Sequence, residues 1–244
     1  MQLDKLEIIK HLKANLLCQV FAGILENGEY EDYIYDSTNN SICIYNGNKI
    51  YFGGQNYDIL NMAVLKLLDK FSVCRFSFID PETHRYIKEK YRLVQSELFD
   101  AYYLRDSNII VDESISRVKY EDIPVICSHS IYVDDTIKER VEGNITKRFS
   151  AGIYVENKLI SWALIHANNT IGPVYTIQDY RNRGYGKKVV CAVSNRLLLQ
   201  NYYPIVTISN DNIEAKHLFS SLNFTRYCSY YWLSIIKSDK EILL

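Results

Sequence analysis

Four basic residues and two glycines stand together in one short loop, a combination that suits the binding of a pyrophosphate. The segment 175–190 reads YTIQDYRNRGYGKKVV, with Gly184 and Gly186 between a predicted strand and a predicted helix. Glycine lets the backbone approach a ligand and adopt positive φ, and a helix start offers unpaired N–H groups and the positive end of a dipole. The basic side chains, which can add charge-assisted hydrogen bonds, are Arg181, Arg183, Lys187 and Lys188. The loop therefore predicts a site for a nucleotide-bearing cofactor.

A plainer interpretation of the loop is that its cations are solvated side chains at a helix start. Four cations at the positive end of a helix dipole destabilise the helix when no anion is bound, so we favour the cofactor site. The net charge of the whole chain is −1, which makes the basic loop a local feature. This balance argues against a general nucleic-acid binder or a binder of anionic membranes.

Length and composition are those of an ordinary globular protein. The chain has 244 residues, of which 48% are hydrophobic and 23% charged, enough for one large domain or two small ones. Its six cysteines are scattered singly, which predicts reduced core thiols, no metal site and a cytoplasmic location. No apolar run reaches the roughly 18 residues that a membrane span needs. Asp4 and Glu7 argue against a signal peptide, and we expect one long amphipathic first helix.

The pattern of elements predicts two successive α/β halves. In the first half we expect strands at Tyr33–Tyr35, Ser41–Tyr45 and Lys49–Phe52 with a turn at Asn46-Gly47, a helix at Tyr57–Lys70, a strand at Val73–Ile79, a helix opened by Asp80-Pro81, and a strand near Leu98–Leu104. In the second half we expect helices at Glu121–Ser130 and Thr136–Gly143, a hairpin from Ala151 to His166 turning at Asn157-Lys158, a strand at Ile171–Ile177, a helix at Gly184–Gln200, a strand at Ile205–Ser209, a helix at Asn212–Leu222, and a last strand pair ending at Ile236.

The two halves run through a similar order of hairpin, strand, helix, strand, helix and strand. We therefore expect two domains, residues 1–110 and residues 111–244, and a degenerate tandem duplication is our hypothesis for their origin. The alternative is that α/β domains often share such an order without common descent. In the first half the segment matching the basic loop reads FGGQNYD and lacks its arginines. A scaffold or lid role is thus expected for this half, in preference to a second active site.

Three segments of the second half resemble the GNAT acyltransferase superfamily. Arg181-x-x-Gly184-x-Gly186 fits its Arg/Gln-x-x-Gly-x-Gly/Ala signature, and NIEAKHLFSSLNF is similar to its Asn-x-x-Ala-x-x-Leu-Tyr-x-x-x-Gly-Phe helix. The residues of that helix in register are Asn212, Ala215, Leu218 and Phe224. The hairpin AGIYVENKLISWALIH resembles the family's second and third strands. The resemblance covers roughly residues 114–236, and SWALI and YTIQDYRNRGYG look most like the glycine N-acyltransferase-like branch.

The resemblance implies a GNAT-like α/β fold, with a mixed, mostly antiparallel sheet flanked by helices, and acetyl-CoA or another acyl-CoA as cofactor. The strand before the loop should pair its backbone with the amide-bearing pantetheine arm, and the loop should hold the pyrophosphate. Asn212 could equally cap its helix, and Phe219 could equally be plain core. The implied cofactor-binding residues are Val174, Tyr175, Thr176, Ile177, Arg181, Asn182, Arg183, Gly184, Tyr185, Gly186, Lys187, Asn212 and Phe219.

The family's proton-transfer residues are missing from this chain. Thr170 stands where many relatives carry a glutamate base, and Phe219 where many carry a tyrosine acid; neither side chain can move a proton in the same way. A water chain or His166 could substitute as base. Residues that we expect to fill strand faces or face solvent are Tyr227, Tyr230, Tyr231 and His217. No catalytic residue is assigned.

Two functions from different classes follow. The first is an N-acyltransferase that moves an acyl group, most simply acetyl, to an amine of a small molecule or amino acid. The second is an acyl-CoA-binding sensor or interaction module that has lost its chemistry. We expect a small-molecule partner and neither nucleic acid nor membrane, with a homodimer left open.

Overall fold

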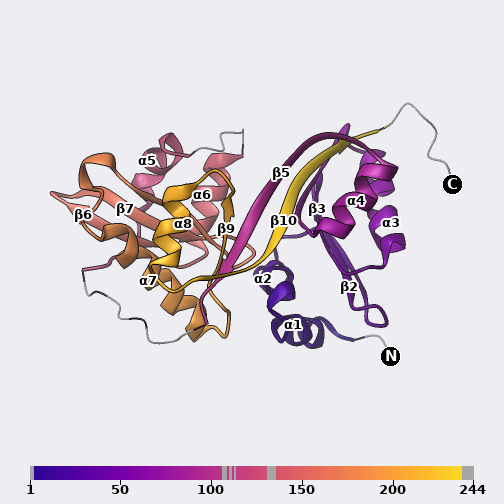
Figure 1. Cartoon of the computed structure of the whole chain (residues 1–244), viewed down its shortest axis with the longest axis horizontal. Coiled ribbons are helices and arrows are strands. Elements are labelled where there is room, and N and C mark those ends of the chain that lie inside the picture. The colour runs from indigo at the N-terminus through magenta and orange to yellow at the C-terminus, as the bar shows by residue number, and fades with distance from the viewer. Residues whose placement is uncertain (1–2, 106–108, 110–111, 113, 131–135, 238–244) are drawn as a thin grey trace. The chain divides into compact units, whose positions relative to one another are not determined.

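The computed structural model describes residues 3–105, 109, 112, 114–130 and 136–237 (Figure 1). The chain forms two compact units, each of which is described by itself. Unit 1 comprises Met1–Ala101, Ile208–Asn212 and Arg226–Leu244, and unit 2 comprises Tyr102–Thr207 and Ile213–Thr225. These units do not follow the expected division at residue 110, because the last strand of the chain pairs with a strand of the first half. The hypothesis of a tandem duplication stays a prediction.

Unit 1 is built on a sheet whose strands come from both ends of the chain. Its elements are the helices α1 (Lys5–Lys13), α2 (Gln19–Asn27), α3 (Tyr57–Leu68) and α4 (Pro81–Lys90), the 3-10 turn η1 (Leu16–Cys18), and the strands β1 (Asp32–Asp36), β2 (Ser41–Asn46), β3 (Lys49–Gly53), β4 (Val73–Ile79), β5 (Arg92–Tyr103) and β10 (Thr225–Ile236). The sheet order is β1-β2-β3-β4-β10-β5, followed by β9 (Ile205–Ser209) at the edge. The strands β5, β9 and β10 each run across a residue boundary between the units.

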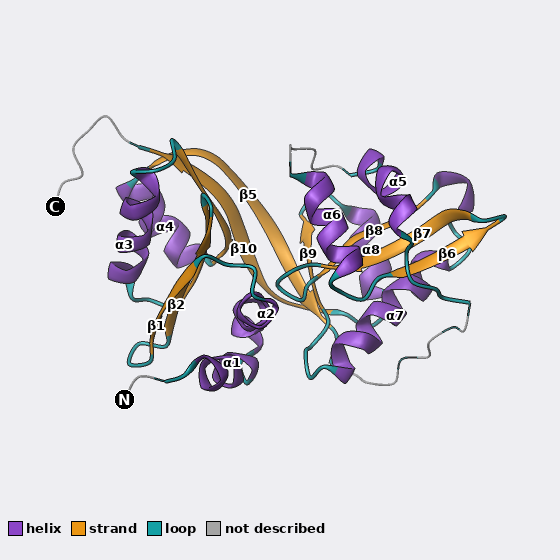
Figure 2. Cartoon of the chain, turned by 180° about the vertical axis from the view of Figure 1, so that it is seen from behind, coloured by secondary structure: helices purple, strands orange, loops and turns teal. Residues whose placement is uncertain are grey.

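One apolar cluster packs α3 and α4 against the sheet of unit 1. Helix α3 packs on β2, β3 and β4, and Ile87 of α4 joins the same apolar cluster (Figure 2). Burial of these side chains, each worth about 1.5–3 kcal/mol when fully removed from water, holds the helices on the sheet. Helix α4 begins as expected: the Asp80 carboxylate accepts hydrogen bonds from the N–H groups of Glu82 and Thr83, and Pro81 occupies the first turn.

Two sequence-based expectations for unit 1 are wrong. The long first helix is interrupted, because Asn15 adopts extended backbone angles and its side chain accepts a hydrogen bond from the N–H of Leu17, which starts η1. The last strand pair is one continuous strand, β10, which is antiparallel to β4 with Tyr231 opposite Ile79 and Ser234 opposite Arg75.

Unit 2 is a three-stranded antiparallel sheet with helices on both faces. Its elements are the helices α5 (Ile123–Ser128), α6 (Ile137–Thr146), α7 (Tyr185–Leu199) and α8 (Ile213–Ser220), the 3-10 turns η2 (Tyr120–Asp122) and η3 (Gln178–Tyr180), and the strands β6 (Ala151–Val155), β7 (Lys158–Ile165) and β8 (Ile171–Thr176). The sheet order is β6-β7-β8. Trp162 stands between Gly152 and Tyr175 in the register and points into the core shared with α5 and α6. Helix α7 packs on all three strands.

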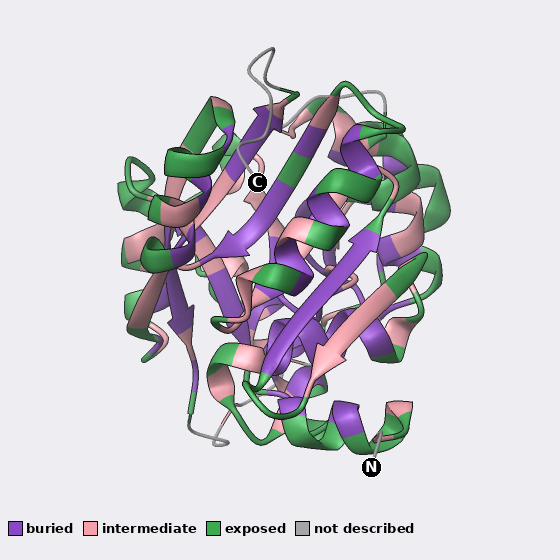
Figure 3. Ribbon diagram, turned by 90° about the vertical axis from the view of Figure 1, so that its right-hand side faces the viewer, coloured by how far each residue is buried: buried purple, intermediate pink, exposed green. Residues whose placement is uncertain are grey.

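The architecture is the expected mixed α/β fold with a mostly antiparallel sheet flanked by helices. Strands are buried over much of their length, and exposed residues gather on helices and loops (Figure 3). Over residues 3–105, 109, 112, 114–130 and 136–237, no helix combines the length and the apolar character that crossing a membrane would require.

Candidate functional site

The basic loop joins the end of β8 to the start of α7, as expected. Within it Asn182 has a φ of 59° and Gly184 a φ of 80°, and this left-handed pair turns the chain into the helix. Gly184 occupies the N-cap position and supplies no side-chain hydrogen bond to the helix start. Gly184 therefore gives the first amides of α7 no side-chain cap of its own, which is the arrangement that an anion can complete.

Arg181 is turned toward the protein. Its Nε donates a hydrogen bond to the carbonyl oxygen of Thr176 at 3.1 Å, and its Nη1 lies 3.5 Å from Oε2 of Glu214 on α8. The guanidinium also lies over the ring of Tyr175, 5.4 Å from its centroid. In this structure Arg181 connects the loop to β8 and to α8, whereas we expected it to contact the pyrophosphate.

The other three cations of the loop differ in their surroundings. Lys188 forms an ion pair with Asp112 at 2.6 Å, which raises the pKa of the lysine and lowers the pKa of the carboxylate. Arg183 is exposed, with its guanidinium 5.5 Å from the centroid of the Tyr180 ring, and Lys187 is exposed in the first turn of α7. Arg183 and Lys187 are thus the cations best able to meet a phosphate.

Gly186 marks a close approach between α7 and β8. A Cβ built at this position would lie 3.4 Å from Oγ1 of Thr176 and 3.7 Å from Cδ2 of Leu218, so a methyl group would fit in ordinary contact. Thr176 is itself held by Ser161, whose hydroxyl oxygen lies 2.8 Å from Oγ1 of Thr176. The two glycines of the motif therefore differ: Gly184 is needed for its positive φ, whereas the position of Gly186 has room for an alanine.

Strand β8 presents one edge that no ladder covers in the described part of the chain. Its other edge pairs with β7 from Ile171 to Thr176, and it is the outer strand of its sheet. It meets β9 at one isolated parallel bridge, between Thr170 and Ile205. The predicted contacts at residues 174–177 lie beyond that bridge, and all four are half-buried. The N–H of Ile177 already donates to the carbonyl oxygen of Ile160, and the carbonyl oxygen of Thr176 accepts from Arg181. An amide-bearing ligand would pair with the other backbone groups along this edge.

Two further predicted cofactor residues lie at opposite ends of α8. Asn212 directly precedes the helix and is exposed, and its N–H donates to the carbonyl oxygen of Ser209 at 3.0 Å. Phe219 is buried, with its ring edge-on to Phe224 at a centroid distance of 4.9 Å. The position of Asn212 suits a helix cap, and the packing of Phe219 is that of a core residue.

Thr170 cannot serve as a base in this environment. It is buried, its Oγ1 donates to Oδ1 of Asn168 at 2.7 Å, and its N–H donates to the same oxygen at 3.2 Å. At the position where many relatives carry a base, Thr170 therefore forms a local hydrogen-bonded turn with Asn168, directly before β8 begins.

His166, the other candidate base, belongs to a polar group within unit 2. Its Nδ1 lies 3.2 Å from Nδ2 of Asn144, and Nη1 of Arg148 donates to Oδ1 of the same asparagine at 3.3 Å. Asn144 and Arg148 are both buried. Sequence reasoning missed these two residues, because polar positions near the end of an amphipathic helix resemble an ordinary solvated face.

The C-terminal tyrosines belong to unit 1. The ring of Tyr230 lies edge-on to Phe78 at 5.5 Å, and Tyr231 stacks on His84 at 3.8 Å. The Tyr227 side chain is buried, which raises its pKa. These three tyrosines fill strand faces, as expected, and His217 is exposed, as expected.

The segment of unit 1 that corresponds to β8, the basic loop and α7 consists of β3, the loop FGGQNYD and α3. Side chains of unit 1 accept hydrogen bonds from the backbone N–H groups at the start of α3. Ser41 Oγ accepts hydrogen bonds from the N–H groups of Gln55 and Asn56, both at 3.0 Å, and Oδ1 of Asn56 accepts from Asp58 at 3.1 Å. The helix start therefore already has the acceptors that an anion would provide in unit 2.

The space around this second loop is also filled. A Cβ built on Gly53 would lie 2.6 Å from the ring of Phe21. Strands β3 and β4 pair in parallel over three positions, from Lys49 opposite Arg75 to Tyr51 opposite Ser77, whereas β8 and β9 share one bridge. Unit 1 thus shows a capped and closed counterpart of the loop.

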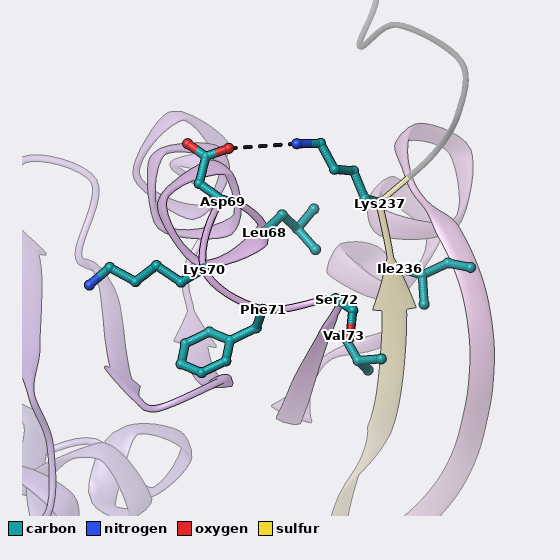
Figure 4. Close-up of a pocket in the computed structure, with 8 residues that line it drawn as sticks. All are labelled: Leu68, Asp69, Lys70, Phe71, Ser72, Val73, Ile236 and Lys237. Carbon is teal, nitrogen blue, oxygen red and sulfur yellow. Dashed lines mark ion pairs between the residues drawn. The ribbon is translucent and has the colours of Figure 1, made fainter.

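One hollow of about 480 Å³ lies in unit 1 (Figure 4). It is lined by the connection from α3 to β4 and by the end of β10, where Asp69 and Lys237 form an ion pair at 3.7 Å. None of the predicted cofactor residues lines this hollow, so we do not assign it to the site.

Comparison with known proteins bears on the family resemblance and on the fold. Residues 150–233 match the family described as FR47-like protein, which is related to GNAT enzymes. A Drosophila protein of known structure is 12% identical, with 96% of this chain and 97% of that one aligned at a TM-score of 0.75. A GCN5-related N-acetyltransferase from Kribbella flavida is 8% identical over 91% and 96% of the two chains, at a TM-score of 0.61. A search of curated proteins finds no match.

A third structure is itself a double-domain protein of this class. The tandem GNAT protein from the clavulanic acid biosynthesis pathway is 8% identical over 92% of this chain and 89% of that one, at a TM-score of 0.58. The resemblance to the GNAT superfamily and the fold class are confirmed. The expected closeness to the glycine N-acyltransferase-like branch stays a prediction.

Proposed function

We propose that this chain, which has the fold of GNAT acetyltransferases, is an acyl-CoA-dependent N-acyltransferase. It would move an acyl group, most simply acetyl, to an amine of a small molecule or amino acid. The observation that carries the proposal is the start of α7, where Asn182 and Gly184 turn the chain into a helix whose first amides receive no side-chain cap from Gly184. A bound pyrophosphate would satisfy those amides and the helix dipole together.

The residues around this helix start divide into three roles toward the cofactor. Arg183 and Lys187 would contact the phosphates, the backbone of residues 174–177 would pair with the pantetheine arm, and Arg181 would keep the loop in place through Thr176 and Glu214. Asn212 and Phe219 remain predicted contacts. The net charge of −1 favours a small-molecule partner over nucleic acid or membrane, and a cytoplasmic location remains part of the proposal.

The reaction forms a C–N bond between the acceptor amine and the acyl carbon and breaks the C–S bond. The nitrogen loses one proton, and the departing thiolate takes up a proton, so that the products are the amide and the coenzyme thiol. The amine must be unprotonated to attack. At pH 7 that costs about 4.6 kcal/mol for a lysine-type amine of pKa near 10.4, and about 1.4 kcal/mol for an α-amino group of pKa near 8. The Thr170 hydroxyl donates a hydrogen bond to Asn168 and cannot act as the base. We therefore propose an acceptor of low amine pKa, for which a protein base is dispensable.

A second function is favoured by the same two substitutions. Because Thr170 is bonded to Asn168 and Phe219 is buried against Phe224, neither family position offers a proton-transfer group. An acyl-CoA-binding sensor or interaction module would keep the loop and lose the chemistry. Binding is common to both functions, so turnover separates them.

Calorimetry with acetyl-CoA, CoA and pantetheine tests the loop directly. We expect acetyl-CoA and CoA to bind and pantetheine, which lacks the pyrophosphate, to bind far more weakly. The double substitution Arg183→Ala with Lys187→Ala should weaken CoA binding by at least about 10-fold, since a single charge-assisted contact is worth about 1.5–3 kcal/mol. Arg196→Ala, an exposed cation in the last turn of the same helix, is the matched control.

The outcome of a thiol-release assay over a panel of amines then distinguishes the two functions. Turnover with amines of low pKa supports the N-acyltransferase, and a strong preference for lysine-like amines would count against the proposed acceptor class. Binding without turnover supports the module. Absence of any binding of acetyl-CoA contradicts both.

A further inference from the structure

His166, Asn144 and Arg148 form a connected polar group at the end of β7. The imidazole Nδ1 lies 3.2 Å from Nδ2 of Asn144, and Oδ1 of Asn144 accepts from Nη1 of Arg148 at 3.3 Å. Asn144 is 4% exposed and Arg148 8% exposed. In so buried a setting each contact must match a donor with an acceptor, because a mismatch costs the desolvation of both groups.

The orientation of the asparagine amide follows from the chemistry of arginine. A guanidinium carries donors only, so the amide atom that faces Arg148 has to be the oxygen. The NH₂ group of Asn144 then faces His166 and donates, and the Nδ1 that receives it has to be the unprotonated nitrogen of the ring. In a neutral imidazole the proton is consequently on Nε2.

The other side of the ring lies against the strand that leads to the basic loop. A Cβ built on Gly172 would lie 2.9 Å from Nε2 of His166, and Gly172 has a φ of 152°, so the absence of a side chain there makes room for the imidazole. The Nε2 edge of the ring therefore lies over the backbone at the start of β8.

We propose that Arg148 and Asn144 are positioning residues that hold His166 in its Nε2-protonated neutral tautomer, so that His166 is a hydrogen-bond donor and not the base for the acceptor amine. The catalytic half of this inference rests on the proposed N-acyltransferase function, and the tautomer itself does not. It also gives a physical reason for an acceptor of low amine pKa: the histidine nearest the family's base position holds its Nε2 proton and has its Nδ1 lone pair engaged.

The tautomer is measured by NMR on protein with ¹⁵N-labelled histidine, without any ligand. His166→Gln assigns the signal, and near pH 7 we expect His166 to show a pyridine-type Nδ1 and a pyrrole-type Nε2. A pyridine-type Nε2, or an imidazolium, in the wild-type spectrum would overturn the proposal. Should His166→Gln fail to fold, through-bond correlation of the ring with its own backbone assigns the signal in the wild type, so the result does not depend on a variant. It is also independent of whether acetyl-CoA binds.

Asn144→Asp tests the positioning role by reversing the polarity of the contact. A carboxylate accepts from both neighbours, so the proton should move to Nδ1 and Nε2 should become pyridine-type. Asn195→Asp makes the same chemical change on α7 and should leave the His166 signals unchanged. An Asn144→Asp spectrum identical to that of the wild type would contradict the assigned role.

A kinetic readout addresses the catalytic half. With Nε2 able to accept a proton, Asn144→Asp should raise kcat/KM for an amine of high pKa relative to one of low pKa by about tenfold or more, which is part of the roughly 10²- to 10⁴-fold that a positioned general base contributes. An unchanged ratio alongside a shifted tautomer would show that His166 does not reach the amine, and would overturn that half alone.

Discussion

Nε of Arg181 donates to the carbonyl oxygen of Thr176 at 3.1 Å, which fastens the basic loop to the strand before it. The same guanidinium lies 3.5 Å from the Glu214 carboxylate and over the Tyr175 ring. Arg181 thus holds the loop against β8 and α8 in this structure. The exposed cations that follow it, Arg183 and Lys187, can contact a ligand.

Arg181→Ala should loosen the loop and weaken CoA binding without removing a phosphate contact. The hydrogen bond to Thr176 is half-exposed, so we expect a loss of about 1 kcal/mol in the free energy of unfolding, at the lower end for a charged donor. Denaturant titration gives the stability and calorimetry the affinity. The control is Glu214→Gln, which removes a long and exposed ion pair and should cost less than about 0.5 kcal/mol. An affinity loss equal to that of Arg183→Ala with Lys187→Ala, at unchanged stability, would indicate a direct phosphate contact instead.

The two glycines of the motif should respond differently to the same substitution. Gly184→Ala forces an alanine into left-handed backbone, at a cost of roughly 1–2 kcal/mol, whereas Gly186→Ala adds a methyl in ordinary contact within a helix and should be neutral or stabilising by up to about 1 kcal/mol. Thermal unfolding of both variants without ligand measures this. Equal destabilisation by the two substitutions would contradict the separate roles.

Each chain should bind one molecule of acetyl-CoA. In unit 1 the counterpart loop is capped by Ser41 and Asn56 and packed by Phe21. Calorimetry should give a stoichiometry near one per chain, and two sites of similar affinity would refute this reasoning. Ser41→Ala should cost about 1 kcal/mol of stability, as loss of a helix cap does, with the affinity for acetyl-CoA unchanged.

Stability should fall with acid in a window that Asp36 helps to set. Hydrogen bonds from the side chains of Asn39 and Asn56 lower the pKa of Asp36 from 3.8 to about 2. A depressed carboxyl pKa contributes stability that is present above the unfolded pKa and is lost as the pH falls through the folded one. The difference in unfolding free energy between the wild type and Asp36→Asn should therefore be constant from pH 7 to about pH 4 and shrink between about pH 4 and pH 2. A difference that does not change with pH across that window would count against these hydrogen bonds.

Much of the local structure could be predicted because its signals are local. The Asp80-Pro81 helix start and the alternating strand at Val73–Ile79 lie where the sequence pattern placed them. The basic loop also lies between the expected strand and helix. The break at Asn15 was missed because one capping side chain overrode an apolar pattern that continues past it.

The remaining features depend on residues far apart in the chain. No local pattern tells that β10 pairs with β4, about 150 residues earlier in the chain. The contact of Arg181 with Glu214 and the burial of Asn144 and Arg148 arise only when α8 and α6 reach the sheet of unit 2. The sequence motif of the basic loop therefore predicts the class of ligand more readily than it predicts the role of each side chain in the loop.

The place of β10 between β4 and β5 has a consequence for how the protein is made. A ribosome delivers β4 and β5 well before it delivers the strand that separates them. Domains usually fold as they emerge, N-terminal first. Here β4 and β5 must wait for β10 before they can take their places in one sheet, so this sheet cannot be completed until unit 2 has also been synthesised.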